Sequence, residues 1–256
     1  MDFGLTGKRA LVLGASRGLG AASAILLAEE GADVIAASRS GALPKGLPDA
    51  LKDKVSTVTL DMTDEASVAA IIALLDKDPV DILVNNCGGP AAGPAKGQST
   101  VSWQAAFNAM AIPMFAITDK ALEAMSEKGW GRVVTIGSSG IVNPIPNLAL
   151  SNGVRGAIAG WSKTLASEVA SAGITVNMVL PGRIATDRLA ELDAGKAKKS
   201  GQDVEAVKAA SRATIPAGRY GKPEEFGAVV TFLCSEQASF VTGSMLRVDG
   251  GMIKGL

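Results

Sequence analysis

The sequence predicts an α/β protein in which helices cover both faces of a doubly wound, seven-stranded parallel sheet. Apolar, β-branched runs alternate with Ala- and Leu-rich amphipathic stretches from one end of the chain to the other, which is typical of βαβ units. Most of the apolar runs are continuous, as expected for strands that are covered on both faces. The chain of 256 residues is 47% hydrophobic, which is enough for one large core.

The expected elements follow one another in strand–helix order. The seven expected strands are Arg9–Leu13, Asp33–Ala37, Val55–Leu60, Val80–Val84, Arg132–Ile136, Ile174–Val179 and Met245–Val248. The expected helices between them are Gly18–Glu30, Asp64–Leu75, Ser102–Met125, Ser151–Ala170 and Pro223–Cys234. Because no internal repeat or low-complexity tract interrupts this order, we expect residues 1–256 to form a single domain.

Two irregular segments lie between the expected strands and helices. Residues 87–97 form a Gly- and Pro-rich loop, and residues 187–213 form a polar stretch with helix-like charge pairs. Ligands of doubly wound folds lie beyond the carboxyl ends of the strands, where such segments gather. Residues 187–213 are therefore a candidate substrate lid.

Composition excludes several classes of function. Lys plus Arg (25) balance Asp plus Glu (25), and no basic stretch carries interleaved aromatics, so no nucleic-acid partner is expected. Cys87 and Cys234 lie far apart in a chain without His, so no metal site is expected. Two isolated thiols suit a reducing compartment, so we expect the protein in the cytoplasm. The N-terminus lacks the apolar run of a signal peptide. The uncharged segment 133–154 contains Pro144 and Pro146, so no membrane span is expected.

A glycine-rich turn joins the first expected strand to the first expected helix. Gly14, Gly18 and Gly20 lie within the run GASRGLG. Such a turn needs small residues because its backbone approaches a pyrophosphate, while the helix N-terminus offers free N–H groups and a partial positive charge. Its place in the first βαβ unit predicts a dinucleotide-binding Rossmann domain. Glycine turns also occur without a ligand, and this alternative stays open at this point.

The end of the second expected strand distinguishes NAD from NADP. An acidic residue there would bind the ribose 2′-hydroxyl, but this chain has Ser38 in that place and Arg39 beside it. Arg39 can pair with a 2′-phosphate, and Arg17 in the glycine turn carries the same charge. These residues favour NADP(H). The alternative is that both arginines only solvate a loop surface.

Six short patterns follow the strands in a fixed order along essentially the whole chain. They are the glycine turn 14–20, Asp61, Asn85-Asn86-Cys87-Gly88, Ile136-Gly137-Ser138, Pro181-Gly182 and Val248-Asp249-Gly250-Gly251. Together they resemble the classical short-chain dehydrogenase/reductase family, most closely its 3-oxoacyl-carrier-protein reductase-like branch. Members of this family are generally tetrameric through the helices that match residues 102–125 and 151–170, so the resemblance implies a homo-oligomer, either a tetramer or a dimer.

The resemblance also implies which residues contact the cofactor. The glycine turn and the ends of the second and third strands would contribute Gly14, Ser16, Arg17, Gly18, Leu19, Gly20, Ser38, Arg39, Asp61 and Met62. Asn86, Cys87 and Gly88 would line the adenosine side, and the nicotinamide end would be held by Pro181, Gly182, Ile184 and Thr186. Cys87 replaces the alanine that is usual at this position, and we expect it to pack inertly rather than to react.

The catalytic residues depart from the family pattern. The family uses a Tyr as general acid, a Lys, a Ser that orients the substrate oxygen, and an Asn in a water-linked proton relay. Ser138 matches the serine, whereas Ser151, Arg155 and Met110 stand at the Tyr, Lys and Asn positions. The one tyrosine of the chain, Tyr220, lies in a segment that the family places outside the catalytic centre.

This departure leaves two hypotheses about function. A serine hydroxyl is a far weaker acid than a tyrosine with a pKa near ~10, and an arginine with a pKa above ~12 keeps its proton. Ser138 and Arg155 can still polarise a carbonyl, and Arg155 can also bond the ribose hydroxyls as the family's lysine does. The first hypothesis is an NADP(H)-dependent oxidoreductase that reduces a ketone, aldehyde or 3-oxoacyl carbonyl to an alcohol with non-standard proton donation. The second is a non-catalytic NADP(H)-binding homologue that acts as a sensor or partner subunit.

Overall fold

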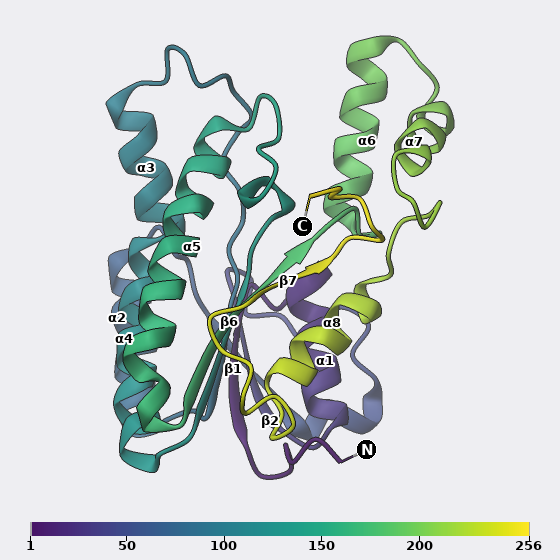
Figure 1. The fold of residues 1–256 in the computed structure, drawn as a ribbon. Coiled ribbons are helices and arrows are strands. Elements are labelled where there is room, and N and C mark those ends of the chain that lie inside the picture. The colour runs from purple at the N-terminus through teal and green to yellow at the C-terminus, as the bar shows by residue number, and fades with distance from the viewer. Residues whose placement is uncertain (1, 256) are drawn as a thin grey trace.

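The computed structural model describes residues 2–255 as one parallel sheet and its covering helices (Figure 1). The strands are β1 (Arg9–Leu13), β2 (Asp33–Ser38), β3 (Val55–Thr59), β4 (Ile82–Asn85), β5 (Gly131–Ile136), β6 (Ile174–Pro181) and β7 (Met245–Val248). The helices are α1 (Gly18–Glu29), α2 (Glu65–Lys77), α3 (Thr100–Met110), α4 (Ile112–Lys128), α5 (Ala149–Val169), α6 (Asp187–Ser200), α7 (Val204–Ala213) and α8 (Pro223–Leu233). Three short 3-10 turns complete the chain: η1 (Asp49–Lys54), η2 (Ser139–Ile141) and η3 (Ala170–Ala172).

The seven strands lie in the order β3-β2-β1-β4-β5-β6-β7, and each neighbouring pair is parallel. The chain winds outward from β1 to β3 on one side and from β4 to β7 on the other. The topological switch point therefore lies between β1 and β4, where doubly wound folds bind their ligands. The predicted fold class is confirmed.

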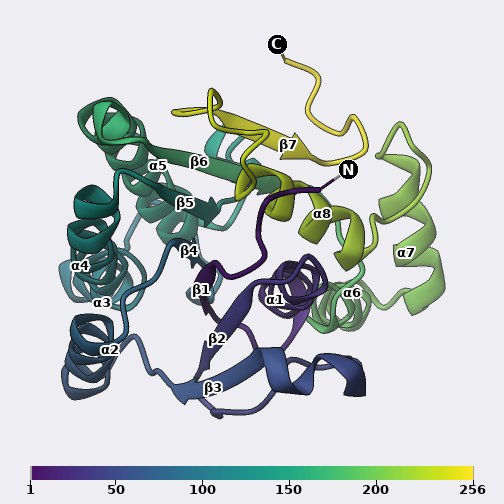
Figure 2. The ribbon, with the colours of Figure 1, turned by 90° about the horizontal axis from the view of Figure 1, so that it is seen from below.

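Alternating side chains of each central strand pack on opposite layers of helices. In β1, Leu11 and Leu13 belong to the core shared with α2, α4 and α5, whereas Val12 belongs to the core shared with α1 and α8. Figure 2 shows these two layers on either side of the sheet. Both faces of the central strands are thus buried, which explains their continuous apolar sequences. The edge strands β3 and β7 instead carry exposed residues, which are Ser56, Thr57 and Thr59 in β3 and Met245 and Arg247 in β7.

The prediction of one helix over residues 102–125 was wrong. The chain forms two consecutive helices, α3 and α4, which meet at Ala111. Pro113 lies at the start of α4, where its missing N–H costs nothing, whereas inside a continuous helix its ring would clash with the carbonyl four residues earlier. The break therefore separates α3, which packs on α5, from α4, which packs on both α2 and β5.

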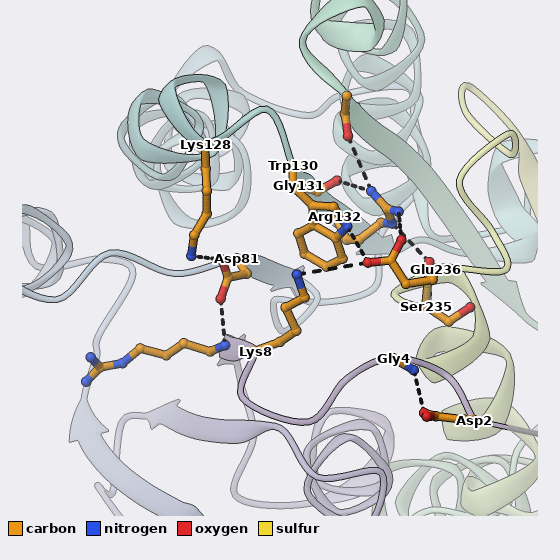
Figure 3. Close-up of polar contacts among 12 residues, drawn as sticks. Asp2, Gly4, Lys8, Asp81, Lys128, Trp130, Gly131, Arg132, Ser235 and Glu236 are labelled. Carbon is orange, nitrogen blue, oxygen red and sulfur yellow. Dashed lines mark hydrogen bonds and ion pairs between the residues drawn. The ribbon is translucent and has the colours of Figure 1, made fainter.

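A buried cation organises the amino-terminal edge of the sheet, shown in Figure 3. Arg132 is 1% exposed and donates to the carbonyl oxygens of Ser235 (3.1 Å), Gly131 (2.9 Å) and Gly173 (3.3 Å). Its guanidinium also lies 4.3 Å from the centre of the Trp130 ring. Burial lowers the pKa of Arg132, and the carboxylate of Glu236, which lies 3.9 Å from its Nη2, opposes that shift. This network joins β5 to the segment after α8, at the end of the sheet opposite the glycine turn.

The candidate lid consists of helices α6 and α7, which stand beyond the carboxyl ends of the strands in Figure 1. The hydroxyl of Tyr220 donates to the carboxylate of Asp193 in α6 at 2.8 Å. Asp193 is 3% exposed, so this bond anchors the lid to the segment that precedes α8. Within residues 2–255, no helix combines the length and the apolar character that a membrane crossing requires.

Candidate active site

The glycine turn after β1 has a backbone that other residues would disrupt. Gly14 and Gly18 each have φ of +63°, in the left-handed region that favours glycine. A methyl group at Gly20 would lie 2.4 Å from the carbonyl oxygen of Gly14, which is closer than any real contact. The three glycines therefore allow a tight turn that presents backbone N–H groups at the start of α1.

The start of α1 is suited to an anion. Its N-cap residue is Arg17, and among residues 2–255 no side chain caps the first turn. The Nδ2 group of Asn86, just after β4, donates to the carbonyl oxygen of Gly14 at 3.4 Å and so ties the ends of β1 and β4 together. Uncapped N–H groups and the positive end of the helix dipole favour a phosphate here. The residues present thus fit the pyrophosphate of a dinucleotide.

The ends of β2 and β3 bring together the residues expected on the adenosine side. Ser38 is 5% exposed, and its hydroxyl lies 3.3 Å from that of Ser40. The carboxylate of Asp61 accepts from the N–H (2.9 Å) and the hydroxyl (2.7 Å) of Thr63, and these bonds hold the pKa of Asp61 below its usual range. The charge of Arg39, which follows β2, lowers that pKa further. Arg39 and Asp61 follow the carboxyl ends of the adjacent parallel strands β2 and β3, where an adenosine would lie.

Two cations connect the glycine turn to the lid. The carbonyl oxygen of Ser16 accepts the N–H of Lys45 at 2.9 Å, which holds the loop after β2 against the turn. The Lys45 ammonium pairs with Asp187 at 3.0 Å, and Arg17 pairs with Glu191 at 3.7 Å. Both carboxylates belong to α6. Leu19, the remaining predicted residue of the turn, packs on the core shared by α1 and α8.

The residues expected at the nicotinamide end lie where β6 ends and α6 begins. A methyl group at Gly182 would lie 2.6 Å from Cα of Asp249, so glycine allows the ends of β6 and β7 to approach. Ile184 is 6% exposed and packs in the core. Thr186 is the N-cap of α6, and its Oγ1 accepts the N–H of Leu189 at 3.3 Å. The methyl side of Thr186 faces the glycine turn, because a methyl group at Gly18 would lie 3.6 Å from Cγ2 of Thr186.

Ser138 lies at the carboxyl end of β5. Its Oγ accepts the N–H of Gly140 at 3.0 Å, which fixes the hydroxyl oxygen and leaves its proton free to donate. Ser151 lies in the first turn of α5, and Arg155 follows one turn later on the same side of the helix. Ser151 and Ser138 are both partly exposed. The three residues predicted as catalytic therefore lie on two neighbouring elements at the same edge of the sheet.

The Arg155 guanidinium joins the ends of β4 and β5. Its Nη1 donates to the carbonyl oxygens of Ile136 (3.2 Å) and Gly137 (3.3 Å), and its Nη2 donates to that of Cys87 (3.2 Å). An arginine has five N–H donors, so within residues 2–255 these bonds leave two of them for a ligand. Arg155 is therefore fixed in place before any substrate arrives.

Cys87 and its neighbours border this arginine. Burial raises the pKa of the Cys87 thiol, and the charge of Arg155 opposes that shift only in part. The thiol is thus protonated at neutral pH, in keeping with the expected packing role. A methyl group at Gly88 would meet no atom of residues 2–255 within 4 Å, so Gly88 borders open space. Met62 packs between the two cores on the α2, α4 and α5 side of the sheet.

Neither Met110 nor Tyr220 supplies a proton in this arrangement. Met110 is 2% exposed and packs with Val154 and Leu180, so an apolar cluster fills the place of a polar relay residue. The hydroxyl of Tyr220 is bonded to Asp193 in the lid, and burial raises the pKa of Tyr220 above its usual value. A side chain held in this way is a structural tether rather than an acid.

The structure adds three polar residues that the sequence did not single out. Asn152 donates from Nδ2 to the carbonyl oxygen of Ile145 at 2.9 Å and so holds the loop between η2 and α5. Lys45 and Glu191 form the contacts to the lid described above. Their place in the sequence could have drawn attention to two of them, because Asn152 follows Ser151 and Glu191 lies in the candidate lid, whereas Lys45 lies in a loop without such a signal.

Comparisons with known proteins agree with this architecture. A family model described as enoyl-(acyl carrier protein) reductase matches residues 14–253. The 3-oxoacyl-acyl-carrier-protein reductase FabG of Vibrio harveyi is 34% identical over 252 residues, which are 97% of this chain and 98% of that protein. The L-sorbose reductase from Gluconobacter frateurii, solved with NADPH and L-sorbose, is 30% identical with a TM-score of 0.92, and the match covers 100% of both chains. The actinorhodin polyketide ketoreductase, solved with NADPH, is 30% identical with a TM-score of 0.87 over 96% of this chain and 97% of that one.

Proposed function

The chain belongs to the short-chain dehydrogenase/reductase family, and we propose that it is an NADP(H)-dependent reductase of a carbonyl substrate whose proton donor is not a tyrosine. The observation that carries this proposal is the fixed pair of Ser138 and Arg155 at the end of β5, beside a turn that fits a dinucleotide. The reaction class is supported by relatives that match nearly the whole chain and are named as reductases. Two of the similar structures hold NADPH.

NADP(H) is the cofactor that the residues fit. When bound, it supplies the hydride, and the protein supplies orientation and charge. Arg17 and Arg39 provide positive charge near the adenosine side, and Ser38 takes the place where a carboxylate would repel a 2′-phosphate. Backbone N–H groups of the glycine turn, which contains Gly14, Gly18 and Gly20, would hold the pyrophosphate, and Thr186 would hold the nicotinamide end.

Ser138 orients and polarises the substrate oxygen. Because the N–H of Gly140 already occupies one lone pair of its Oγ, the Ser138 hydroxyl points its proton elsewhere, and a carbonyl oxygen is the natural acceptor. The remaining N–H groups of Arg155 stabilise negative charge that develops on that oxygen. Preorganised donors of this kind cost no reorganisation during the reaction, since both are held by the backbone.

The proton must come from a source other than the family's acid. Ser151 is too weak an acid, and Arg155 keeps its proton. The smaller Ser151 leaves room for water or for an acidic group of the substrate beside Arg155, and we propose that one of these delivers the proton. Loss of a positioned general acid costs about 10²–10⁴ in rate, so a slow reductase is expected rather than an inactive one.

A substrate panel tests this proposal. Ketones, aldehydes, quinones and 3-oxoacyl thioesters are incubated with NADPH and enzyme while the NADPH absorbance is followed. We expect slow oxidation of NADPH with at least one carbonyl class, and its loss in Ser138→Ala. Undetectable turnover with every class would contradict the proposal.

A second candidate function is a non-catalytic NADP(H)-binding sensor or partner subunit. The observation that favours it is the apolar packing of Met110 and Val154 at the relay position, which leaves no polar path for protons there. The double variant Ser151→Tyr with Arg155→Lys separates the two. A reductase with altered proton donation gains activity from the restored acid, whereas a sensor gains none.

We also propose a homo-oligomer, preferably a tetramer, that forms through α4 and α5. The rings of Phe115 in α4 and Trp161 in α5 are in contact, with centres 4.4 Å apart and planes tilted by 35°, and both residues are partly exposed. Light scattering should give about four times the 25.9 kDa chain mass, and a mass of one chain would contradict this.

The free thiols of Cys87 and Cys234 favour a reducing compartment, and we propose the cytoplasm. The proposed role of residues 187–213 is that of a substrate lid.

A further inference from the structure

Two ion pairs link the cofactor side of the molecule to the first turns of α6. The Arg17 guanidinium lies 3.7 Å from the Glu191 carboxylate, and the Lys45 ammonium lies 3.0 Å from that of Asp187. Lys45 also bonds both carboxylate oxygens of Asp187. Each pair joins segments that are far apart in the sequence, so neither pair is a local helix contact.

The two cations lie on the side of the turn where the 2′-phosphate would bind. The N–H of Lys45 donates to the carbonyl oxygen of Ser16, so its backbone is fixed next to Arg17. Arg39 directly follows β2 and adds a third cation on the expected adenosine side. Of these three cations on the expected adenosine side, Arg17 and Lys45 are paired with lid carboxylates.

We infer that Asp187 and Glu191 determine cofactor specificity by competing with the 2′-phosphate of NADP(H) for Lys45 and Arg17. This inference rests on the proposed cofactor site. A phosphate monoester carries nearly two negative charges, and a carboxylate carries one, so the phosphate is the stronger partner for both cations. The side chains of all four residues are at least half exposed, so the existing pairs are weak and can exchange partners.

The exchange has a structural consequence for the lid. When the phosphate takes Arg17 and Lys45, helix α6 loses both of its ion pairs to the cofactor-binding segments. NAD(H) lacks the 2′-phosphate and leaves these pairs in place. The start of α6 therefore keeps both ion pairs when NAD(H) is bound and loses them when NADP(H) is bound. The lid is consequently more mobile in the NADP(H) complex.

The variant Glu191→Gln tests the inference by calorimetric titration with NADPH and NADH. Removing this competitor should raise NADPH affinity by about 2- to 5-fold, the range typical of an exposed ion pair, while NADH affinity stays nearly constant. The effect should shrink in high salt, which screens exposed charges. Lys45→Gln should lower NADPH affinity by a similar factor and spare NADH.

Glu205→Gln is the matched control. Glu205 lies in α7 and pairs at 2.8 Å with Lys208 of the same helix, so the change removes the same charge without touching the cofactor segments. Its NADPH affinity should equal that of the wild type. Hydrogen exchange gives a second measurement that does not depend on activity. Amides of α6 should exchange faster in the protein saturated with NADPH than in the protein saturated with NADH.

The outcomes separate this inference from the proposed function. If Glu191→Gln weakens NADPH binding, leaves it unchanged, or shifts both nucleotides by one factor, the competition is refuted while the cofactor assignment stands. Slower exchange of α6 with NADPH would also refute it. If the wild type binds neither nucleotide, the cofactor site itself is wrong.

Discussion

The substitution Gly20→Ala adds one methyl group at the point where the glycine turn meets α1. That methyl would lie 2.4 Å from the carbonyl oxygen of Gly14 and 2.9 Å from Nδ2 of Asn86. The closer partner is backbone, and ordinary contacts begin at 3.4 Å, so the turn must move by about 1 Å to admit it. Because Asn86 ties this turn to β4, the displacement also disturbs the end of the neighbouring strand.

The displacement should affect both stability and binding. Overpacking of this kind costs about 1–3 kcal/mol, which lowers the thermal midpoint of a chain this long by roughly 2–6 °C. A shift of about 1 Å in the phosphate-binding backbone should reduce NADPH and NADH affinity together by on the order of 10-fold or more. Calorimetry measures the midpoint, and titration with each nucleotide measures the two dissociation constants.

Gly195→Ala is the control for this experiment. A methyl group at Gly195 in α6 would meet no atom of residues 2–255 within 4 Å, and alanine favours a helix over glycine by about 1 kcal/mol. Its midpoint should rise slightly, and its nucleotide affinity should stay the same. If Gly20→Ala bound NADPH like the wild type and melted at the same temperature, the assignment of this turn as the phosphate site would be refuted.

Two further substitutions probe other parts of the molecule. Tyr220→Phe removes the bond to buried Asp193 and should lower the thermal midpoint by roughly 3 °C, since such a bond contributes about 1.5 kcal/mol. Turnover should persist, whereas a loss of about 10²-fold or more would show that Tyr220 is an acid after all. Arg132→Met removes the donor of two buried carbonyl groups and of the partly buried carbonyl of Gly173, and should cost about 3 kcal/mol, or roughly 6 °C. Nucleotide affinity should be unchanged because Arg132 lies at the start of β5, whereas the glycine turn follows the carboxyl end of β1, and a selective loss of binding would contradict that placement.

Much of the architecture is encoded in patterns that a reader can see in the sequence. The strand β1 begins and ends as predicted, and α8 starts at Pro223 as predicted, because each boundary coincides with a change between apolar runs and punctuating residues. The glycine turn was located because a tight turn and a close approach leave no alternative to glycine. The division of α3 from α4 could have been predicted from Pro113, but the apolar periodicity on both sides of it concealed the break.

The polar contacts of the site were harder to predict, since they join distant segments. Lys45 and Asp187 are 142 positions apart in the chain, and nothing local indicates that they meet. Arg155 was expected to bind a substrate or a ribose, but its three bonds to backbone carbonyl groups depend on the exact register of β4 and β5. Sequence patterns identify residue types near a site, while such pairings follow from tertiary packing.

The measurement that bears most directly on the central claim is the ratio of the dissociation constants for NADH and NADPH. Isothermal titration of the wild type and of Arg39→Gln gives this ratio with and without the cation at the end of β2. We predict that the wild type binds NADPH at least about 10-fold more tightly than NADH, and that Arg39→Gln removes most of this preference. Equal or inverted affinities in the wild type, or no binding of either nucleotide, would contradict the account.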